Sequence, residues 1–376
     1  MSRSGVSRSG VSRCRGCGGT ELTRVLDLGN APAAEQFPLI SDPLTPAEAM
    51  HPLAMDLCGC CGLAQLAGDV AFDAEEQQSV EPRAMQDQAA DAVRRVADGG
   101  WLRGNTVREF GSPHGGTWLP LLAERGYREA EIADVVLDTF GLMHDCDQRA
   151  AFELRAKATA ADGVLLVQIP SLMAMVSQGQ WNLLRHSHFG YHSLTALTNL
   201  LGAVGMSIAT VWEFDLLGGT YLAAAVHGRV ERDERADEIL KAERHFGVTK
   251  PYVLRRMQQA VDVHVAQLRQ WLETQADQQH SVYAYCAGSR VPGLFSVAGI
   301  DRRLIRGIAD ASPDKHGRRV PGTDIEIISP EQLLAADPDR VLLTLPYLYD
   351  EVRRTYPQLD GRWWVDNGTS VTQGPA

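Results

Sequence analysis

The sequence predicts an α/β protein in which a small cysteine-rich module precedes two units built around parallel sheets. Two observations carry this prediction. Short apolar runs of strand length alternate with helical segments, and this order produces parallel sheets. Most of the cysteines are crowded into the start of the chain, between Cys14 and Cys61. With 376 residues and roughly 150 residues per domain, the chain has room for two or three domains.

The cysteine-rich module is expected over residues 13–72, where Gly and Pro are frequent and long periodic runs are absent. A segment of this size needs a bound metal ion or another cross-link to be stable, because it cannot bury a large hydrophobic core. Before it, residues 1–12 repeat SRSGV and lack apolar residues for a core. This tail is therefore expected to be disordered.

Two C-x-x-C knuckles predict a structural zinc ion in this module. Cys14 and Cys17 form the first knuckle, and Cys58 and Cys61 form the second. Four thiolates at this spacing close one tetrahedral Zn²⁺ and leave no open position for a substrate. Cys60 is the spare cysteine of the second knuckle. The alternative is a small turn that holds buried thiols.

The charge balance restricts the class of partner. The chain has 36 basic and 47 acidic residues, a formal charge of −11, and a field of this sign repels nucleic acid and anionic membranes. It contains no run of roughly 20 apolar residues that could span a bilayer. Its Arg-rich start leads into cysteines rather than into an apolar signal core. A soluble, cytoplasmic protein with a small-molecule partner is predicted, and the oligomeric state stays open.

Residues 73–230 are expected to form the first of the two sheet-based units. A helix over 75–103 leads into alternating strands and helices, with helical segments near 119–126 and 148–160. The expected strands are 107–110, 132–140, 163–170, 207–212 and 220–226.

The rest of the chain is expected to form connecting helices over 231–275 and a smaller α/β unit over 276–376. In the helix predicted from Pro251 to Thr274, apolar residues recur at three- or four-residue intervals and form one face. The runs VYAYCAG, DIEIIS and RVLLTLP are three strand candidates for a smaller parallel sheet.

The densest group of titratable side chains lies between Arg185 and Ser193, in the segment RHSHFGYHS. Histidine titrates near neutral pH, so several histidines around a pocket suit proton transfer at a carbonyl substrate. Zinc binding by alternate histidines is the rival interpretation. At least one histidine, His186 first, is expected to be a hydrogen-bonded core residue. The candidate catalytic residues are His186, His188, Tyr191 and His192.

Further candidates lie where predicted strands end. His144 and Asp145 follow the strand 132–140, at the edge where open α/β sheets bind ligands. Lys315 and Arg318 lie in a cation-rich turn that could neutralise a diphosphate, with a solvated turn as the equal alternative. Together with Arg185 and Ser187, these four are the candidate substrate-binding residues.

A glycine-rich segment, EFGSPHGG, follows the strand 107–110. Backbone N–H groups at such a strand-to-helix turn can face a cofactor, and Gly111, His114 and Gly115 are the candidates. A nucleotide site of this kind also needs an acidic residue at the end of the next strand, to hold the ribose hydroxyls. That strand is expected to be missing, because Gly126 runs almost at once into the strand that begins at Ile132. A glycine-rich turn that serves only to pack the following helix is an equally good explanation for these glycines.

These motifs resemble those of the three-domain, S-adenosylmethionine-dependent C-methyltransferases that act on nucleotide-linked keto-deoxysugars in antibiotic biosynthesis. The resemblance covers nearly the whole chain: it includes both cysteine knuckles, EFGSPHGGTWL, HSHFGYHSL, LLGGTYLA, AYCAGSRVPGLF and DKHGRRVPGTDIEIISPEQL. It implies a zinc module, a Rossmann-like methyltransferase domain and a C-terminal domain that helps to hold a nucleotide sugar. It also implies a histidine base that removes a proton next to a ketone.

The chain departs from this family pattern around the cofactor. The family loop Gly-x-Asn-Asp-Gly reads here as residues 111–115 without its acidic side chain, and a strand, its carboxylate and a further helix and strand are expected to be deleted between Gly126 and Ile132. Ser187 and Gln168 replace two family glutamates, and no tyrosine occurs over 75–87. The second signature histidine is retained as His188.

These losses predict a divergent, truncated member that no longer methylates. Losing several charge-assisted hydrogen bonds, each worth roughly 1.5–3 kcal/mol, would weaken cofactor binding on the order of thousands-fold. The predicted reaction is epimerisation, isomerisation, elimination or cyclisation of a carbonyl-bearing intermediate, with His188 as base. Two alternatives stay open: a working C-methyltransferase with a site rebuilt from His114, Asp138 and Asp145, and a non-catalytic scaffold partner.

Overall fold

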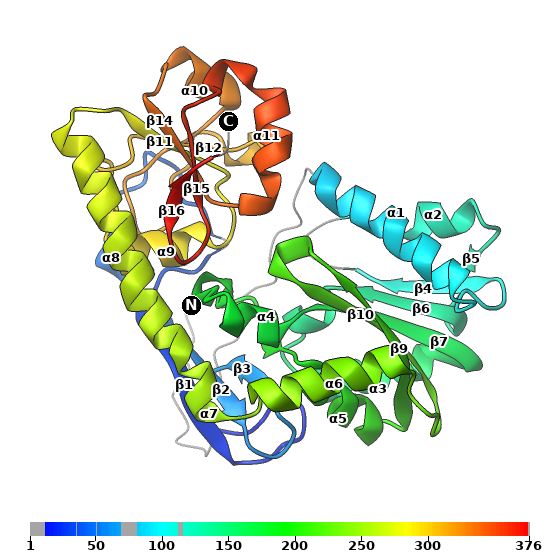
Figure 1. Ribbon diagram of the computed structural model, residues 1–376. Helices are drawn as coiled ribbons and strands as arrows, with labels where there is room; N and C mark the ends of the chain where they lie inside the picture. The colour runs from blue at the N-terminus through cyan, green and yellow to red at the C-terminus, as the bar shows by residue number, and fades with distance from the viewer. Residues whose placement is uncertain (1–11, 35, 50, 69–80, 112–115, 375–376) are drawn as a thin grey trace, which may run out of the picture.

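The computed structural model describes residues 12–34, 36–49, 51–68, 81–111 and 116–374. Three sheets organise these residues, one in each of three parts of the molecule (Figure 1). The expected tail at 1–12 lies outside the described residues except for Ser12. No helix in the described ranges is long and apolar enough to cross a membrane.

The first sheet belongs to the N-terminal module and has the order β1-β2-β3-β8. Its own strands are antiparallel: β1 (Leu22–Ala31), β2 (His51–Cys58) and β3 (Ala64–Leu66). The fourth strand, β8 (Gly190–Tyr191), comes from the histidine-rich segment and pairs with Ala64 and Gln65. Sequence reasoning placed this segment near a pocket and did not predict that it completes the sheet of another module.

The central sheet has the order β5-β4-β6-β7-β10-β9. Strands β5, β4, β6 and β7 are parallel, and β10 runs antiparallel between β7 and β9. One face packs against α1 and α2, and the other against α3, α5 and α6 (Figure 1). The strands are β4 (Thr106–Phe110), β5 (Arg128–Glu129), β6 (Ala133–Thr139), β7 (Thr159–Pro170), β9 (Met206–Phe214) and β10 (Thr220–His227). The helices are α1 (Arg83–Asp98), α2 (Leu119–Ala123), α3 (Gln148–Ala158), α4 (Leu172–Ser177) and α5 (Leu194–Ala203).

Strand β5 corrects one prediction. The strand expected to be missing after Gly126 is present, but it has only two residues, and these pair with Thr106 and Val107 at the amino end of β4. A chain of six residues between Gly126 and the start of β6 is long enough for one short parallel pairing and no more. The central sheet is therefore shortened at this edge rather than interrupted.

Three helices connect the central and C-terminal sheets: α6 (Glu234–Phe246), α7 (Pro251–Leu254) and α8 (Arg256–Asp277). The single helix predicted over 251–274 is divided at Arg255, which caps the end of α7 and the start of α8. Helix α8 runs along one side of the molecule from the N-terminal module to the C-terminal sheet (Figure 1).

The C-terminal sheet has the order β13-β12-β11-β14-β15-β16. It is parallel except for the antiparallel β16 at its edge. It has as many strands as the central sheet, but none is longer than four residues, in line with the smaller sheet that the sequence predicts. Its strands are β11 (Val282–Tyr285), β12 (Ile308–Ala309), β13 (Ile327–Ile328), β14 (Arg340–Leu343), β15 (Trp363–Asp366) and β16 (Val371–Gln373). Its helices are α9 (Val291–Ala298), α10 (Pro330–Ala335) and α11 (Tyr349–Thr355).

One hydrophobic cluster joins the N-terminal module to the C-terminal part. It contains Met55 of β2, Trp181 before β8, Leu268 of α8 and Ile308 of β12, all buried. Because side chains from both ends of the sequence share this cluster, the N-terminal module and the C-terminal sheet are packed as one body. The central sheet has its own clusters on its two faces.

Candidate active site

A cavity of about 70 Å³ lies where the central sheet meets the start of α9. Phe140, directly after β6, and Pro170, the last residue of β7, line it, so the cavity lies at the carboxyl edge at which open α/β sheets bind ligands. Its walls are mostly apolar. Its polar lining side chains are Ser171, Arg185, His188, Tyr191, His192, Ser289, Arg290 and Tyr347.

Local capping fixes the segment that carries the histidines. Ser193 caps α5 by accepting a hydrogen bond from the Ala196 amide, and Ser171 caps α4 by accepting one from the Ala174 amide. The Leu172 amide then donates to the His192 carbonyl at 3.0 Å, which ties the two helix starts together. The histidine-rich segment is thus held by two helix starts and by its pairing with β3.

Arg185 and His188 form the polar centre of the cavity. Arg185 Nε donates to His188 Nε2 at 2.8 Å, and its Nη2 lies 2.5 Å from the same atom. An arginine only donates, so Nε2 is the acceptor of a neutral imidazole whose proton is on Nδ1. Tyr191 Oη accepts from the Arg185 amide at 3.1 Å. The predicted base is thus present in the cavity, with its basic nitrogen held by a guanidinium.

His192 is a second lining imidazole, and its tautomer is fixed by Gln148. The Gln148 amide nitrogen donates to the carbonyls of Leu142 and Asp145 at 2.7 and 2.6 Å, so its Oε1 faces His192 Nε2 at 2.9 Å. His192 Nε2 therefore carries the proton. Burial lowers the pKa of His192 to about 4. The sequence analysis did not identify Gln148. A polar residue at the start of a helix is usually exposed to solvent, and nothing in the sequence shows that this one is buried.

Gly190 is required beside this pair. A Cβ at this position would lie 2.8 Å from Gln148 Oε1 and 2.8 Å from His192 Cε1. The close approach explains a glycine within the histidine-rich segment.

His186 does not line the cavity, and its catalytic assignment is not supported by its position. It is 2% exposed, and its Nε2 lies 3.3 Å from the carbonyl oxygens of both His51 and Pro52. Burial lowers its pKa to about 4. The structure confirms the expectation of a hydrogen-bonded core histidine.

Three of the predicted substrate-binding residues also lie outside the cavity lining. His144 Nδ1 is 3.0 Å from the Ser187 carbonyl, and its ring packs edge-on against that of His188 with centroids 4.6 Å apart. Ser187 is itself buried. Asp145 is 2.7 Å from Arg155 Nη2. His144 and Ser187 thus support the cavity from behind His188, and Asp145 belongs to an ion-pair network.

The residues expected to hold the nucleoside half of S-adenosylmethionine do not fit it in the described part of the chain. Gly111 is exposed at the end of β4, while His114 and Gly115 lie outside the described residues. Glu129, the last residue of β5, pairs with Val107, three residues and so roughly 10 Å before β4 ends. Asp138 is fully buried and bound to Arg155. Neither carboxylate is placed to hold ribose hydroxyls at the cavity edge.

The four predicted zinc ligands do fit a metal ion. The Sγ atoms of Cys14, Cys17, Cys58 and Cys61 all lie within 4.8 Å of one another. Two of the separations are 3.5 Å, between Cys14 and Cys61, and 3.6 Å, between Cys17 and Cys58. Tetrahedral zinc with bonds of about 2.3 Å needs sulfur atoms about 3.8 Å apart. Cys60 is exposed and outside this group, as predicted.

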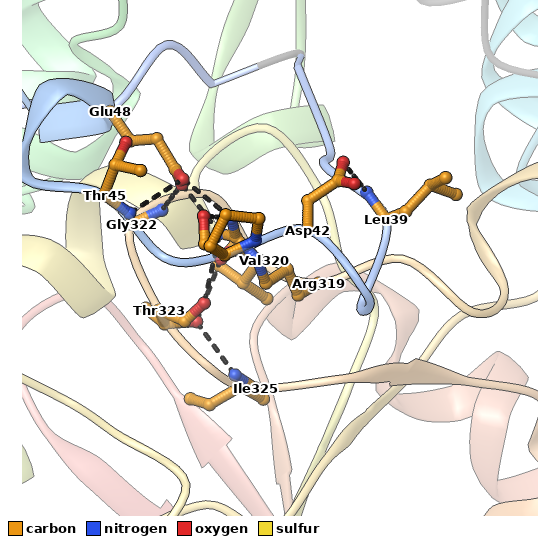
Figure 2. A network of polar contacts seen from close by, with 10 residues as sticks. Leu39, Asp42, Thr45, Glu48, Arg319, Val320, Gly322, Thr323 and Ile325 are labelled. Atoms are coloured by element: carbon orange, nitrogen blue, oxygen red, sulfur yellow. Dashed lines mark hydrogen bonds and ion pairs between the residues drawn. The ribbon is translucent and has the colours of Figure 1, made fainter.

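The cation-rich turn is occupied by contacts within the chain. Arg318 Nη1 donates to the Phe37 carbonyl at 2.8 Å, and Lys315 Nζ donates to the Ala287 carbonyl at 3.0 Å. Arg319 forms a bidentate pair with Glu48, both contacts 2.7 Å (Figure 2). The turn therefore docks residues 37–48 of the N-terminal module onto the C-terminal part, and its placement does not support diphosphate binding.

Comparisons with known sequences match two parts of the chain to described families. Residues 14–74 match a family described as a zinc binding domain, and residues 215–364 match one described as the C-methyltransferase C-terminal domain. The C-methyltransferase NovU of Streptomyces niveus is 24% identical over 380 residues, which covers 89% of each chain.

Solved structures resemble only a part of the chain. Magnesium protoporphyrin IX methyltransferase from Synechocystis PCC 6803, with bound SAH, is 16% identical and covers 43% of this chain and 90% of its own, with a TM-score of 0.29. The 1,6-didemethyltoxoflavin-N1-methyltransferase of Burkholderia thailandensis is 10% identical and covers 44% of this chain and 96% of its own, with a TM-score of 0.28. Likeness at this level carries no argument about cofactor or substrate.

Proposed function

Because the chain belongs to the family of three-domain C-methyltransferases, we propose that it removes a proton from a carbon next to a carbonyl group of a small biosynthetic intermediate. The reaction takes place in the cavity between the central sheet and α9. A proton is then delivered to the opposite face of this carbon or to a neighbouring atom, so that the outcome is an epimerisation or isomerisation. The observation that carries this proposal is the contact between Arg185 and His188 in an apolar cavity.

The two side chains have complementary roles in this reaction. When a substrate oxygen takes the place of His188 Nε2 at the guanidinium of Arg185, Nε2 is released as a base. The C–H electron pair then moves toward the carbonyl oxygen, the proton moves to Nε2, and Arg185 neutralises the enolate oxygen. His188 then gives this proton up to water and is neutral again, and a proton from water adds to the opposite face of the carbon or to a neighbouring atom. Arg185 is as necessary as His188 in this proposal, because the negative charge on the enolate oxygen needs a nearby cation to stabilise it.

The shortened edge of the central sheet supports an outcome without methyl transfer. Glu129, the carboxylate at the end of β5, pairs with Val107 and so lies short of the end of β4, and Asp138 is bound to Arg155. Each charge-assisted hydrogen bond lost would weaken cofactor binding by about tenfold or more.

C-methylation is the second candidate, and the comparisons favour it. The match of residues 215–364 to the C-methyltransferase C-terminal domain and the relative from Streptomyces niveus point to C-methyltransferases. This candidate shares the proton removal by His188 and differs in requiring S-adenosylmethionine.

Two measurements on the purified protein separate the candidates. Calorimetric titration with S-adenosylmethionine is expected to show no binding at micromolar concentration. Incubation in D₂O with a thymidine diphosphate-linked 4-keto-6-deoxysugar or with 2-oxobutyrate is expected to show deuterium exchange next to the ketone by mass spectrometry. Micromolar cofactor binding with a methylated product would establish the second candidate instead.

A pair of variants identifies the base in the same assay. His188→Phe is expected to abolish exchange, whereas His227→Phe, at the end of β10 and outside the cavity lining, should retain it. Equal exchange by both variants would contradict the role of His188. If the wild-type protein exchanges neither probe and binds no cofactor, a non-catalytic partner becomes the better explanation.

A further inference from the structure

The second cysteine knuckle carries a thiol that the four-cysteine group does not use. Cys60 lies in the turn between two of the ligands, Cys58 and Cys61, and it is exposed. The backbone of this turn is fastened to the segment after the first knuckle, because the Gly59 amide donates a hydrogen bond to the Glu21 carbonyl at 2.8 Å. The turn therefore holds Cys60 at the rim of the ligand group.

Cys17 differs from the other three ligands because it is exposed. Cys14, Cys58 and Cys61 are at most 6% exposed, so a solute in water reaches the sulfur of Cys17 far more easily than theirs. A cysteine that binds zinc is a thiolate, and the thiolate is the form of cysteine that reacts with oxidants. Cys17 is thus the ligand at which an oxidant can react.

The two exposed thiols border the same small space. A Cβ placed on Gly19 would lie 3.3 Å from Cys17 Sγ and 3.1 Å from Cys60 Sγ. Because Gly19 has no side chain, a change of rotamer is enough to bring the two sulfur atoms into contact. An accessible thiolate beside a second thiol is the arrangement that redox-sensitive cysteines use.

We propose that Cys17 and Cys60 form a redox modification site, at which hydrogen peroxide joins the two thiols in a disulfide bond and the module loses its zinc. The Cys17 thiolate attacks one peroxide oxygen, the O–O bond breaks, and hydroxide leaves, so that Cys17 becomes a sulfenic acid. The Cys60 sulfur then attacks the Cys17 sulfur, the S–O bond breaks, and the Cys60 proton leaves with the hydroxyl group as water. The two sulfur atoms lose two electrons in total, and the peroxide gains them.

The new disulfide removes a ligand that Cys60 cannot replace. A disulfide sulfur carries no charge and is a poor zinc ligand, and Cys60 is consumed in the same bond. The effect extends beyond the knuckles, because β3 begins at Ala64, three residues after Cys61, and pairs with β8 of the histidine-rich segment. The inference concerns the zinc module and does not depend on the reaction in the cavity.

Peroxide treatment of the zinc-loaded protein tests the inference without a substrate. The wild-type protein is expected to release its zinc to a chromogenic chelator, and peptide mass mapping should find a disulfide between Cys17 and Cys60. Cys60→Ser keeps all four ligands and should slow zinc release by about tenfold or more, because the sulfenic acid then has no neighbouring free thiol. The matched variant Cys146→Ser, at an exposed cysteine outside the ligand group, should release zinc at the wild-type rate.

The identity of the disulfide and the fate of the metal decide the result. Dithiothreitol with added zinc should restore the metal content of the oxidised wild-type protein, which supports a reversible disulfide. A disulfide between two ligands, such as Cys17 and Cys58, would overturn the inference, and so would equal rates of zinc release from the wild type and Cys60→Ser. It would also be overturned if the protein kept its zinc with Cys17 and Cys60 joined, or if peroxide left both thiols unchanged.

Discussion

At the scale of single residues, the most informative feature is the buried ion pair between Asp138 and Arg155. The side chain of Asp138 is fully buried and that of Arg155 is 5% exposed, and Arg155 Nη2 lies 2.7 Å from a carboxylate oxygen of Asp138. The Arg155 guanidinium also packs on the Phe110 ring at 4.5 Å. This group fills the carboxyl edge of the central sheet beside the end of β4, where the family pattern places the cofactor.

Removal of Arg155 should therefore be costly. Arg155→Met leaves the Asp138 carboxylate buried without its partner, and the free energy of unfolding is expected to fall by about 3–5 kcal/mol. Urea denaturation measures this change. Arg149→Met, on the same helix with a 67% exposed side chain paired to Glu153, should change stability by less than about 0.5 kcal/mol. Equal effects of the two variants would contradict the assignment of a buried ion pair.

At the scale of elements, the two cysteine knuckles hold a module that has little sheet of its own. Strands β1, β2 and β3 are closed on one side only by the two-residue β8. The four clustered thiolates supply the missing constraint, because zinc binding contributes directly to folding in small modules.

Zinc content should follow the four ligands and not the fifth cysteine. Cys58→Ser is expected to lose the metal and to open residues 14–66 to proteolysis, whereas Cys60→Ser, two residues away and exposed, should keep both zinc and resistance. Metal analysis by mass spectrometry together with limited trypsin digestion measures both. Loss of zinc from Cys60→Ser would show that the knuckle uses a different set of ligands.

A second element-scale feature is the clamp between residues 37–48 and the turn that contains Arg319. Arg319 is 2% exposed, and its guanidinium, with the Gly322 amide, holds the carboxylate of Glu48 (Figure 2). These contacts lower the pKa of Glu48 from 4.5 to about 2. The folded state therefore binds this proton more weakly than the unfolded chain does.

The clamp predicts a specific dependence of stability on pH. Because the pKa of Glu48 is lower in the folded state, its contribution is full above about pH 4.5 and is lost as the pH falls toward 2. The contribution amounts to about 3 kcal/mol at neutral pH. Glu48→Gln should reduce the loss of stability between pH 5 and pH 2.5, measured by urea denaturation. Glu124→Gln, at an exposed glutamate after α2, should follow the wild-type curve; if Glu48→Gln follows it too, the clamp contributes nothing measurable.

At the scale of the whole molecule, the shared hydrophobic cluster makes the two ends of the chain one cooperative unit. Helix α8 lies in the middle of this cluster: Leu268 is fully buried, whereas Val263 on the same helix is 52% exposed. The N-terminal module and the C-terminal sheet should therefore unfold in the same transition.

Leu268→Ala tests this cooperativity. The cavity left by the truncation is expected to lower the free energy of unfolding by about 2–4 kcal/mol. Zinc release, followed with a chromogenic chelator, and loss of tryptophan fluorescence should shift together to lower urea concentration. Val263→Ala should leave both transitions in place. A shift of fluorescence without a shift of zinc release would show that the two parts unfold independently.

The sequence by itself determined the features that depend on local spacing. The four zinc ligands follow from two C-x-x-C knuckles, and the long strands β6, β7 and β10 follow from continuous apolar runs. The histidine-rich segment was recognisable because several titratable residues occur within a few positions. All of these signals lie within short windows of the chain.

Only the tertiary structure decided how these pieces are used. It placed His188 against Arg185 in a cavity and His186 in a core, although the two histidines are separated by one residue. It brought Arg290 to the same cavity from the C-terminal part, and it assigned the cations near Arg318 to a clamp between modules. Charges and hydrogen bonds act through space and depend on burial, so partners that are far apart in the sequence leave no local pattern.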